Sequence, residues 1–150
     1  MALARALVAP GDPPEATTTI HRTWLARDGL GKADFDKNKM ALSEWSGGVI
    51  RLAPIAAVLG VAEGIETALS VTQLTGIACW SAMAAGNFEK IELPPGVREV
   101  HAFADDDPAG IDAAMRAVRR WEAAGLETYM RLPPEGFNDY NDVLTGKRKK

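Results

Sequence analysis

Downstream of residue 55 the chain alternates between short apolar runs and helix-like segments, and this alternation restricts its fold more than any other feature. The apolar runs have the length of buried strands and lie at residues 57–62, 77–80, 97–103 and 126–132. Residues 65–74 and 109–124 have the pattern of helices, and Gly76 stands where the first of them should end. Alternation of this kind predicts an α/β fold: a mostly parallel sheet flanked by helices.

The first third of the chain is different. Residues 10–16 are rich in Pro and Gly and predict a loop, and Thr17 to Leu25 is β-branched and aromatic, which predicts a strand. Residues 32–35 have the composition to pair back as a hairpin, and residues 49–52 predict another short strand. We therefore expect a small β-rich N-terminal lobe.

The expected organisation is a lobe over residues 1–54, an α/β domain over 55–146 and a basic tail over 147–150. A length of 150 residues with 47% apolar and 25% charged residues suits an ordinary globular domain. One Cys and two His exclude a disulfide framework and a multi-ligand zinc site of the usual kind. No signal peptide or membrane-length apolar run is present, so we expect a cytoplasmic protein with no membrane partner.

Charge is distributed unevenly along the chain. Residues 61–146 carry six Lys or Arg against fourteen Asp or Glu, whereas the last four residues are all basic. A negative domain that meets phosphates needs cations to do so, and the basic residues of the lobe and tail are available to attract a polyanion. For the short tail itself, a solvated and disordered segment is the preferred interpretation.

Acidic residues gather where the predicted strands end. Asp105, Asp106 and Asp107 follow one strand, Glu63 follows an earlier one, and Asp139 and Asp142 come after the last. The carboxyl ends of parallel strands share one edge of the sheet, which is where ligands bind in such folds. Crowded carboxylates repel one another unless a cation neutralises them, and Mg²⁺ prefers carboxylate oxygens and phosphates as ligands. The pattern predicts a metal-dependent site for phosphate chemistry.

Each acidic group also has a purely structural interpretation. Asp107 before Pro108 is a favourable helix start, with Asp as the N-cap and Pro in the first turn. Glu63 before Gly64 fits an exposed turn, and Asp139 or Asp142 fits the cap of a last helical turn at residues 140–144. These interpretations stay open for each residue taken alone. The joint pattern favours function.

Three segments together resemble the Toprim domain of bacterial-type DNA primases, topoisomerases and some nucleases. They are Val61 to Ser70, Phe103 to Gly110, and Asp139 to Leu144. The nearest resemblance is to Toprim primases of phages, plasmids and other mobile elements, some of which are fused to helicases. Residues 21–25, 28–29, 32–33, 39–40 and 47–52 resemble the segment that precedes Toprim in those primases. The resemblance implies a Toprim-like, Rossmann-like sheet.

The resemblance implies roles for four acidic residues. Glu63 matches a glutamate thought to act in acid/base or metal chemistry, and Asp105 and Asp107 match the two aspartates that hold Mg²⁺. Asp139 matches a further acidic position that helps a second metal, and Glu66 is interpreted only as a favourable charge near a helix N-terminus. Mg²⁺ is the expected cofactor, with Mn²⁺ as an alternative ion.

The resemblance also implies contacts to nucleic acid or nucleotide. It assigns them to Arg22, Lys32, Lys39, Gly64 and Asn141. Lys and Arg more often lie on a solvated surface, which is the competing interpretation of the three basic residues.

The function implied is the catalytic core of a DNA primase that synthesises short RNA primers on single-stranded DNA from NTPs. A metal-dependent Toprim nuclease and a non-catalytic nucleic-acid-binding module are the alternatives. The sequence contains neither the zinc-binding module nor the helicase domain of many such primases. It is therefore expected to be an excised catalytic core, a truncated gene product, or a stand-alone protein whose helicase or zinc-binding module acts in trans. A phosphoacceptor receiver domain or a haloacid-dehalogenase-like phosphatase fits less well. Both need a catalytic Lys after a later strand, and Lys90 is the only Lys between residues 40 and 146.

Overall fold

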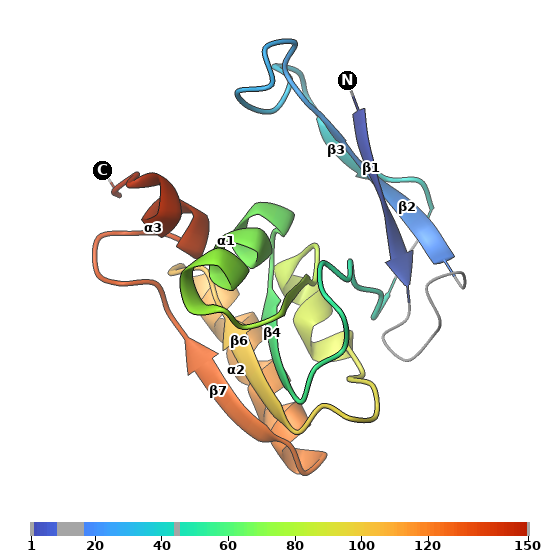
Figure 1. Cartoon of the computed structure of the whole chain (residues 1–150), viewed down its shortest axis with the longest axis vertical. Helices are drawn as coiled ribbons and strands as arrows, with labels where there is room; N and C mark the ends of the chain where they lie inside the picture. The colour runs from blue at the N-terminus through green and yellow to red at the C-terminus, as the bar shows by residue number, and fades with distance from the viewer. Residues whose placement is uncertain (1, 9–16, 44–45, 150) are drawn as a thin grey trace.

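The computed structural model describes residues 2–8, 17–43 and 46–149 (Figure 1). The loop expected at residues 10–16 and the last residue of the basic tail lie outside these ranges. The chain forms two sheets, one of three strands and one of four.

The larger sheet is entirely parallel, with the strand order β5-β4-β6-β7. Its strands are β4 (Val58–Ala62), β5 (Cys79–Ser81), β6 (Glu99–Phe103) and β7 (Glu127–Arg131). All four were predicted, with ends displaced by at most two residues. The predicted α/β fold, a parallel sheet flanked by helices and preceded by a small β-rich lobe, is confirmed.

Helices cover both faces of this sheet. They are α1 (Ile65–Thr75), the 3₁₀ helix η1 (Ala85–Lys90), α2 (Pro108–Ala123) and α3 (Tyr140–Thr145). Helix α1 packs with α3 on one face, and α2 packs with η1 on the other (Figure 1). Gly76 ends α1 at a φ of 76°, a left-handed conformation that glycine adopts without steric cost.

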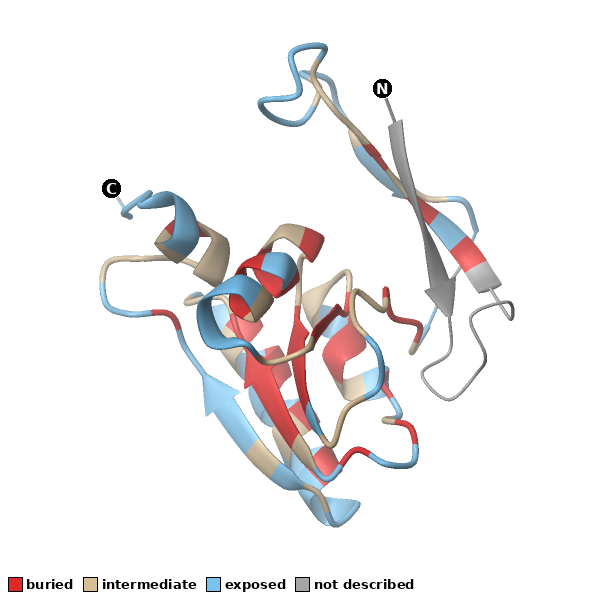
Figure 2. Cartoon of the chain, viewed as in Figure 1, coloured by how far each residue is buried: buried red, intermediate tan, exposed pale blue. Residues whose placement is uncertain are grey.

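The core follows the same division. On the α2 face, Leu59, Val61 and Val100 pack with Trp121, while on the α1 face Phe103 packs with Ala68 and its neighbours. The four strands at the centre of Figure 2 are buried except for β7, which is mostly exposed. Burial of this many apolar side chains, at about 25 cal/mol per Å², is the main force that fixes the strand ends in place.

The smaller sheet is antiparallel and forms the N-terminal lobe. It contains β1 (Ala2–Val8), β2 (Thr17–Trp24) and β3 (Lys39–Ala41) in that order. The predicted strand at residues 17–25 is confirmed, but β1 was not predicted. The hairpin expected from residues 32–35 is reduced to an isolated bridge between Lys32 and Leu25. The strand that pairs with β2 on this side is β3, at residues 39–41.

Two other expectations need correction. The strand expected at residues 49–52 is only an isolated bridge between Ile50 and Ser81, because these residues bury themselves beside β5 instead of extending a sheet. The tail was expected to be free in solvent. Instead Lys149 donates to a side-chain oxygen of Asp106 at 2.7 Å, and the guanidinium of Arg148 lies over the ring of Phe137.

Candidate active site

The predicted acidic residues meet in a pocket of about 180 Å³ at the carboxyl ends of the parallel strands. We call it the acidic pocket. Its lining residues come from the lobe, from the ends of β4 and β6, and from the starts of α1 and α3. They are Lys32, Lys39, Glu63, Gly64, Glu66, Thr67, Asp105, Asp139 and Asn141. Seven of these nine are residues to which the sequence assigned a role in catalysis or binding. The predicted convergence of three strand-end segments is therefore present in the structure.

Asp105 is placed by a close contact between the loop after β6 and the first turn of α2. A Cβ atom on Gly110 would lie 2.8 Å from the backbone oxygen of Asp105, a distance too short for any larger residue. Asp107 is the N-cap of α2, and its Oδ1 accepts the amide proton of Gly110 at 2.7 Å. The structural interpretation of Asp107 is thus confirmed, and its carboxylate does not line the acidic pocket.

Asp139 is placed in the same way at the start of α3. Its Oδ1 accepts the amide proton of Asp142 at 2.7 Å, so its structural interpretation as a cap is confirmed as well. Unlike Asp107, Asp139 also lines the acidic pocket, so one carboxylate serves both the helix start and the pocket wall. Asn141 is two residues further and lies within hydrogen-bonding distance of Ser70 on α1.

Burial and neighbouring carboxylates raise the pKa of two acidic residues of the pocket, Asp105 and Glu63. Burial, followed by the charges of Glu63, Asp139, Asp107 and Asp142, raises the pKa of Asp105 to about 7. Burial and the charge of Asp107 also raise the pKa of Glu63. Bringing these groups together as anions is therefore unfavourable unless positive charge is supplied, which is the electrostatic signature of a functional site.

The chemistry of the acidic residues fits a divalent cation. The Oδ1 atom of Asp105 is buried without a hydrogen-bond partner, and hard cations bind such carboxylate oxygens. As placed, the side chains of the described residues do not yet form a group of three acidic, His or Cys ligands close enough to hold an ion. Asp105, Glu63 and Asp139 are the residues that would hold one after adjustment of their side chains.

Two lysines of the N-terminal lobe bring positive charge to the pocket rim. Lys32 and Lys39 contact the carboxylate of Glu66 on α1 at 3.0 and 3.6 Å, and all three side chains are about 39% exposed. Burial opposes ionisation of Glu66, but its own backbone amide and the two lysines hold its pKa below the usual value. Burial and the neighbouring Lys32 lower the pKa of Lys39. Both lysines therefore lie beside the acidic residues, and their expected contact with nucleic acid or nucleotide stays a prediction.

Arg22 is the predicted basic residue that the structure does not bring to this pocket. It lies on β2, and its guanidinium rests over the ring of Trp24 at 5.1 Å. Alternate residues of a strand face opposite sides of a sheet, so Arg22 and the neighbouring His21 point to different faces of the lobe. The charges of Lys39 and Glu66 act on His21, which places that face of β2 nearer the pocket.

Three residues of the site had no functional assignment from sequence. Glu66 was interpreted only as a helix-terminal charge, yet it is the partner of both lysines. Thr67 lines the pocket, and Asp142 is 6% exposed and adds its charge to that of Asp105. The spacing of Glu66 three residues after Glu63 was the available signal, since it places both near the amino end of α1.

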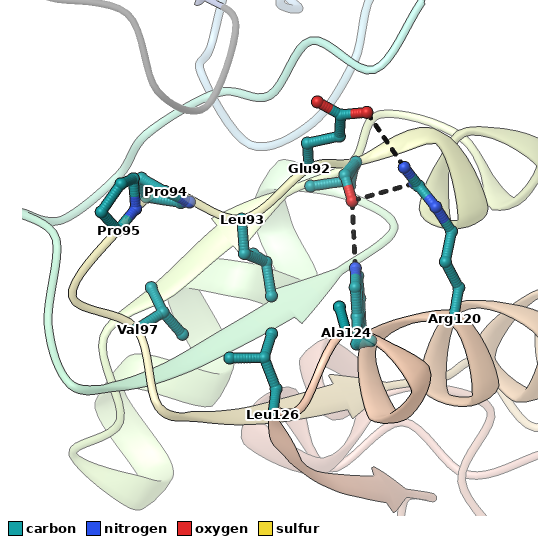
Figure 3. A pocket seen from close by; sticks show the side chains of 10 residues that line it. Glu92, Leu93, Pro94, Pro95, Val97, Arg120, Ala124 and Leu126 are labelled. Atoms are coloured by element: carbon teal, nitrogen blue, oxygen red, sulfur yellow. Dashed lines mark hydrogen bonds and ion pairs between the residues drawn. The ribbon is translucent and has the colours of Figure 1, made fainter.

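A second pocket, of about 410 Å³, lies at the opposite end of the sheet (Figure 3). It is formed by residues 91–97 and by the end of α2, and its floor includes Leu93, Val97 and Leu126. Arg120 is held there by Glu92, and the indole of Trp121 donates to the backbone oxygen of Ile91. This pocket is mostly apolar and has none of the clustered carboxylates of the first.

No helix in the described part of the chain is long and apolar enough to cross a bilayer.

Comparison with solved structures shows the same fold in several primases. A DNA primase domain from Pseudomonas aeruginosa superposes with a TM-score of 0.65 at 15% identity, covering 97% of this chain and 48% of that one. The primase fragment of the bacteriophage T7 primase-helicase protein gives 0.59 at 20% identity, covering 85% and 59%. A DnaG primase catalytic domain bound to single-stranded DNA gives 0.57 at 15% identity, covering 95% and 48%. The chain thus spans about half the length of these structures.

Family comparison divides the chain where the structure does. Residues 3–52 match a domain of unknown function (DUF7146), and residues 58–149 match a Toprim domain. No curated protein matches the chain. The Toprim match covers more than half of the chain and includes every acidic residue of the pocket. The chain therefore belongs to the Toprim family, with a primase-type arrangement of lobe and sheet.

Proposed function

We propose that this chain is the catalytic core of a Mg²⁺-dependent primase, which joins NTPs into short RNA primers on single-stranded DNA. The observation that carries the proposal is the meeting of Asp105, Glu63 and Asp139 with the lobe residues Lys32 and Lys39 in one pocket. Carboxylates alone suit many metal-dependent hydrolases. Lysines beside them suit a site that must also hold the phosphates of a nucleotide.

The charges of the pocket residues suggest a different role for the carboxylates and for the lysines. Asp105, Glu63 and Asp139 would hold Mg²⁺, which supplies neutralisation of the charge that develops on phosphate oxygens and orients an in-line displacement. We assign Glu63 to metal binding, because the charge of a bound cation would oppose the raised pKa that Glu63 has without metal. Lys32 and Lys39 would bind the triphosphate as point charges, with Glu66 as their counter-ion before it arrives.

The test is an assay of the chain with single-stranded DNA, labelled NTPs and Mg²⁺ or Mn²⁺. Extended oligoribonucleotides are expected, and Asp105→Asn should reduce their formation by about 100-fold or more, the loss typical of removing one group that stabilises transition-state charge. The matched control is Asp112→Asn, which changes an exposed aspartate on α2 outside the pocket. Circular dichroism checks that both variants stay folded.

Other outcomes identify the alternatives. Shortened DNA would replace the primase proposal with a Toprim nuclease, in which water takes the place of the 3′-hydroxyl. Binding of DNA without synthesis or cleavage, in the presence of a helicase and a zinc-binding module supplied in trans, would leave a non-catalytic module. Equal activity of Asp105→Asn and Asp112→Asn would remove the acidic pocket from the mechanism.

A further inference from the structure

Strand β7 is the outer strand of the parallel sheet, and no described residue pairs with its outer edge (Figure 1). The amide of Glu127 donates to Arg98, and the carbonyl of Arg131 accepts from Ala104, so these backbone groups face β6. Backbone groups alternate in direction along a strand. Those of Thr128 and Met130 therefore point outward, away from the sheet.

This edge lacks several of the features that usually prevent edge pairing. Charged residues pointing into the edge, Pro, bulges or covering loops normally protect such strands. Residues 127–131 contain no Pro and no Lys, and β7 pairs with β6 in a continuous register without a bulge. Tyr129 and Met130 are each 37% exposed, and Leu132 directly after the strand is 40% exposed.

The strand sequence is complementary to itself in the antiparallel direction. With Tyr129 opposite Tyr129 of a second copy, Glu127 falls opposite Arg131 and Arg131 opposite Glu127. Thr128 then faces Met130, and their outward backbone groups meet as a hydrogen-bonded pair on either side of the centre. A parallel pairing in register would instead place Glu127 against Glu127, which is unfavourable.

The three charged or aromatic side chains of one face contact one another within each copy. Glu127, Tyr129 and Arg131 alternate along β7 and so share one face of the sheet. The Tyr129 hydroxyl donates to Glu127, and the guanidinium of Arg131 lies over the Tyr129 ring at 5.0 Å. Arg131 also donates to the ring of His101 on β6 at 3.1 Å. Pairing with a second copy therefore turns Arg131 from this neutral partner toward the opposite charge of Glu127.

We propose that two copies of this chain associate through β7, edge to edge and antiparallel, around a two-fold axis at Tyr129. The two four-stranded sheets then form one continuous sheet, with Glu127 of each copy paired to Arg131 of the other. A strand pair of five residues buries less than the roughly 1,600 Å² of a standard interface, so the dimer is weak and depends on concentration. Because the paired strands run in opposite directions, the two acidic pockets lie at opposite ends of the joined sheet, and neither is covered.

The test is sedimentation velocity of the whole chain over a range of concentrations, with charge reversals at the two positions. The wild type should dimerise, and Glu127→Arg or Arg131→Glu alone should each raise the dissociation constant by about 10-fold or more, since both cross-strand pairs become repulsive. The double variant Glu127→Arg/Arg131→Glu should dimerise like the wild type. An equimolar mixture of the two single variants should form a heterodimer.

Thermal melting of each variant shows whether it is folded, and the restored dimer of the double variant distinguishes pairing from misfolding. A monomeric wild type at all concentrations, or single variants that dimerise as tightly as the wild type, would overturn the proposal. Its failure is separate from that of the proposed function, because these residues lie outside the acidic pocket and primer synthesis per chain should be the same in all variants.

Discussion

The N-terminal lobe and the parallel sheet contribute to the acidic pocket in opposite ways. The sheet has a dense core that includes Leu59, Val61 and Trp80, none of which is measurably exposed, and it fixes the carboxylates at its strand ends. The lobe exposes much of its apolar surface, including Leu30 and Phe35, and its contribution to the pocket is two lysines. The sheet supplies negative charge from strand ends that a closely packed core holds in place, and the lobe supplies positive charge.

The largest expected difference between the two regions is in stability. Leu59→Ala on β4 should lower the free energy of unfolding by about 2–5 kcal/mol, because it leaves a cavity in a closely packed core. Met40→Ala on β3 removes a side chain that is 41% exposed and should change it by about 0.5 kcal/mol or less. Denaturant titration measures both. Equal losses of unfolding free energy in the two variants would mean that Met40 is as closely packed as Leu59, which would contradict the difference between lobe and sheet.

The next effect concerns charge supplied by the lobe. Lys39→Ala should weaken NTP binding by about 10-fold, as expected for the loss of one charged contact, while the unfolding midpoint stays nearly constant. Lys32→Ala should act in the same direction. The control is Arg27→Ala, an exposed residue of the same lobe that does not line the pocket. Fluorescence titration with an NTP analogue measures the dissociation constant of each variant. An equal effect of Arg27→Ala would mean that the lobe attracts NTPs by its overall positive charge and not through the two lysines of the pocket.

The smallest effect is a pH dependence with opposite sign at two carboxylates. The pKa of Asp105 is raised to about 7, so without metal the folded state binds more protons than the unfolded chain, and stability should fall as pH rises from about 4 to 7. The pKa of Glu66 is lowered, so its contribution is present above its unfolded pKa and is lost in acid.

Thermal melting in EDTA measures both contributions. Asp105→Asn should flatten the decline between pH 4 and 7 by about 2–4 °C, a small value because water screens a partly exposed group. Mg²⁺ should restore stability to the wild type at pH 7 and have less effect on the variant. Glu66→Gln should lower the melting temperature at neutral pH and lose less on acidification. The same slope for both variants would contradict the opposing roles of these two carboxylates.

Sequence predicted the sheet and the acidic residues because both follow from local pattern. A strand of buried apolar residues ends where polar residues begin, so the placement of Asp105 and Glu63 at one edge required only the parallel topology. The partner of Glu66 was not predictable in this way, because Lys32 lies 34 residues earlier and reaches it only through the folded lobe. Strand β1 was missed because its short apolar run has no alternation to distinguish a strand from other apolar segments.

The basic tail was misjudged for the same reason. Lys149 meets Asp106 across 43 residues of sequence, which no local rule detects. Asp106 was predicted only as one of three crowded carboxylates after a strand, and its carboxylate instead forms an ion pair with Lys149.

The contact between Gly110 and Asp105 has a mechanical consequence. Since there is no room for a single methyl group between them, the first turn of α2 packs directly against the backbone of the loop after β6. The far end of α2 is fastened in turn by the indole of Trp121 to the backbone of Ile91. The backbone of Asp105 is therefore packed against the start of a sixteen-residue helix whose other end is also held by the core. An incoming ion meets a ligand that belongs to a loop but whose backbone is as closely packed as the core.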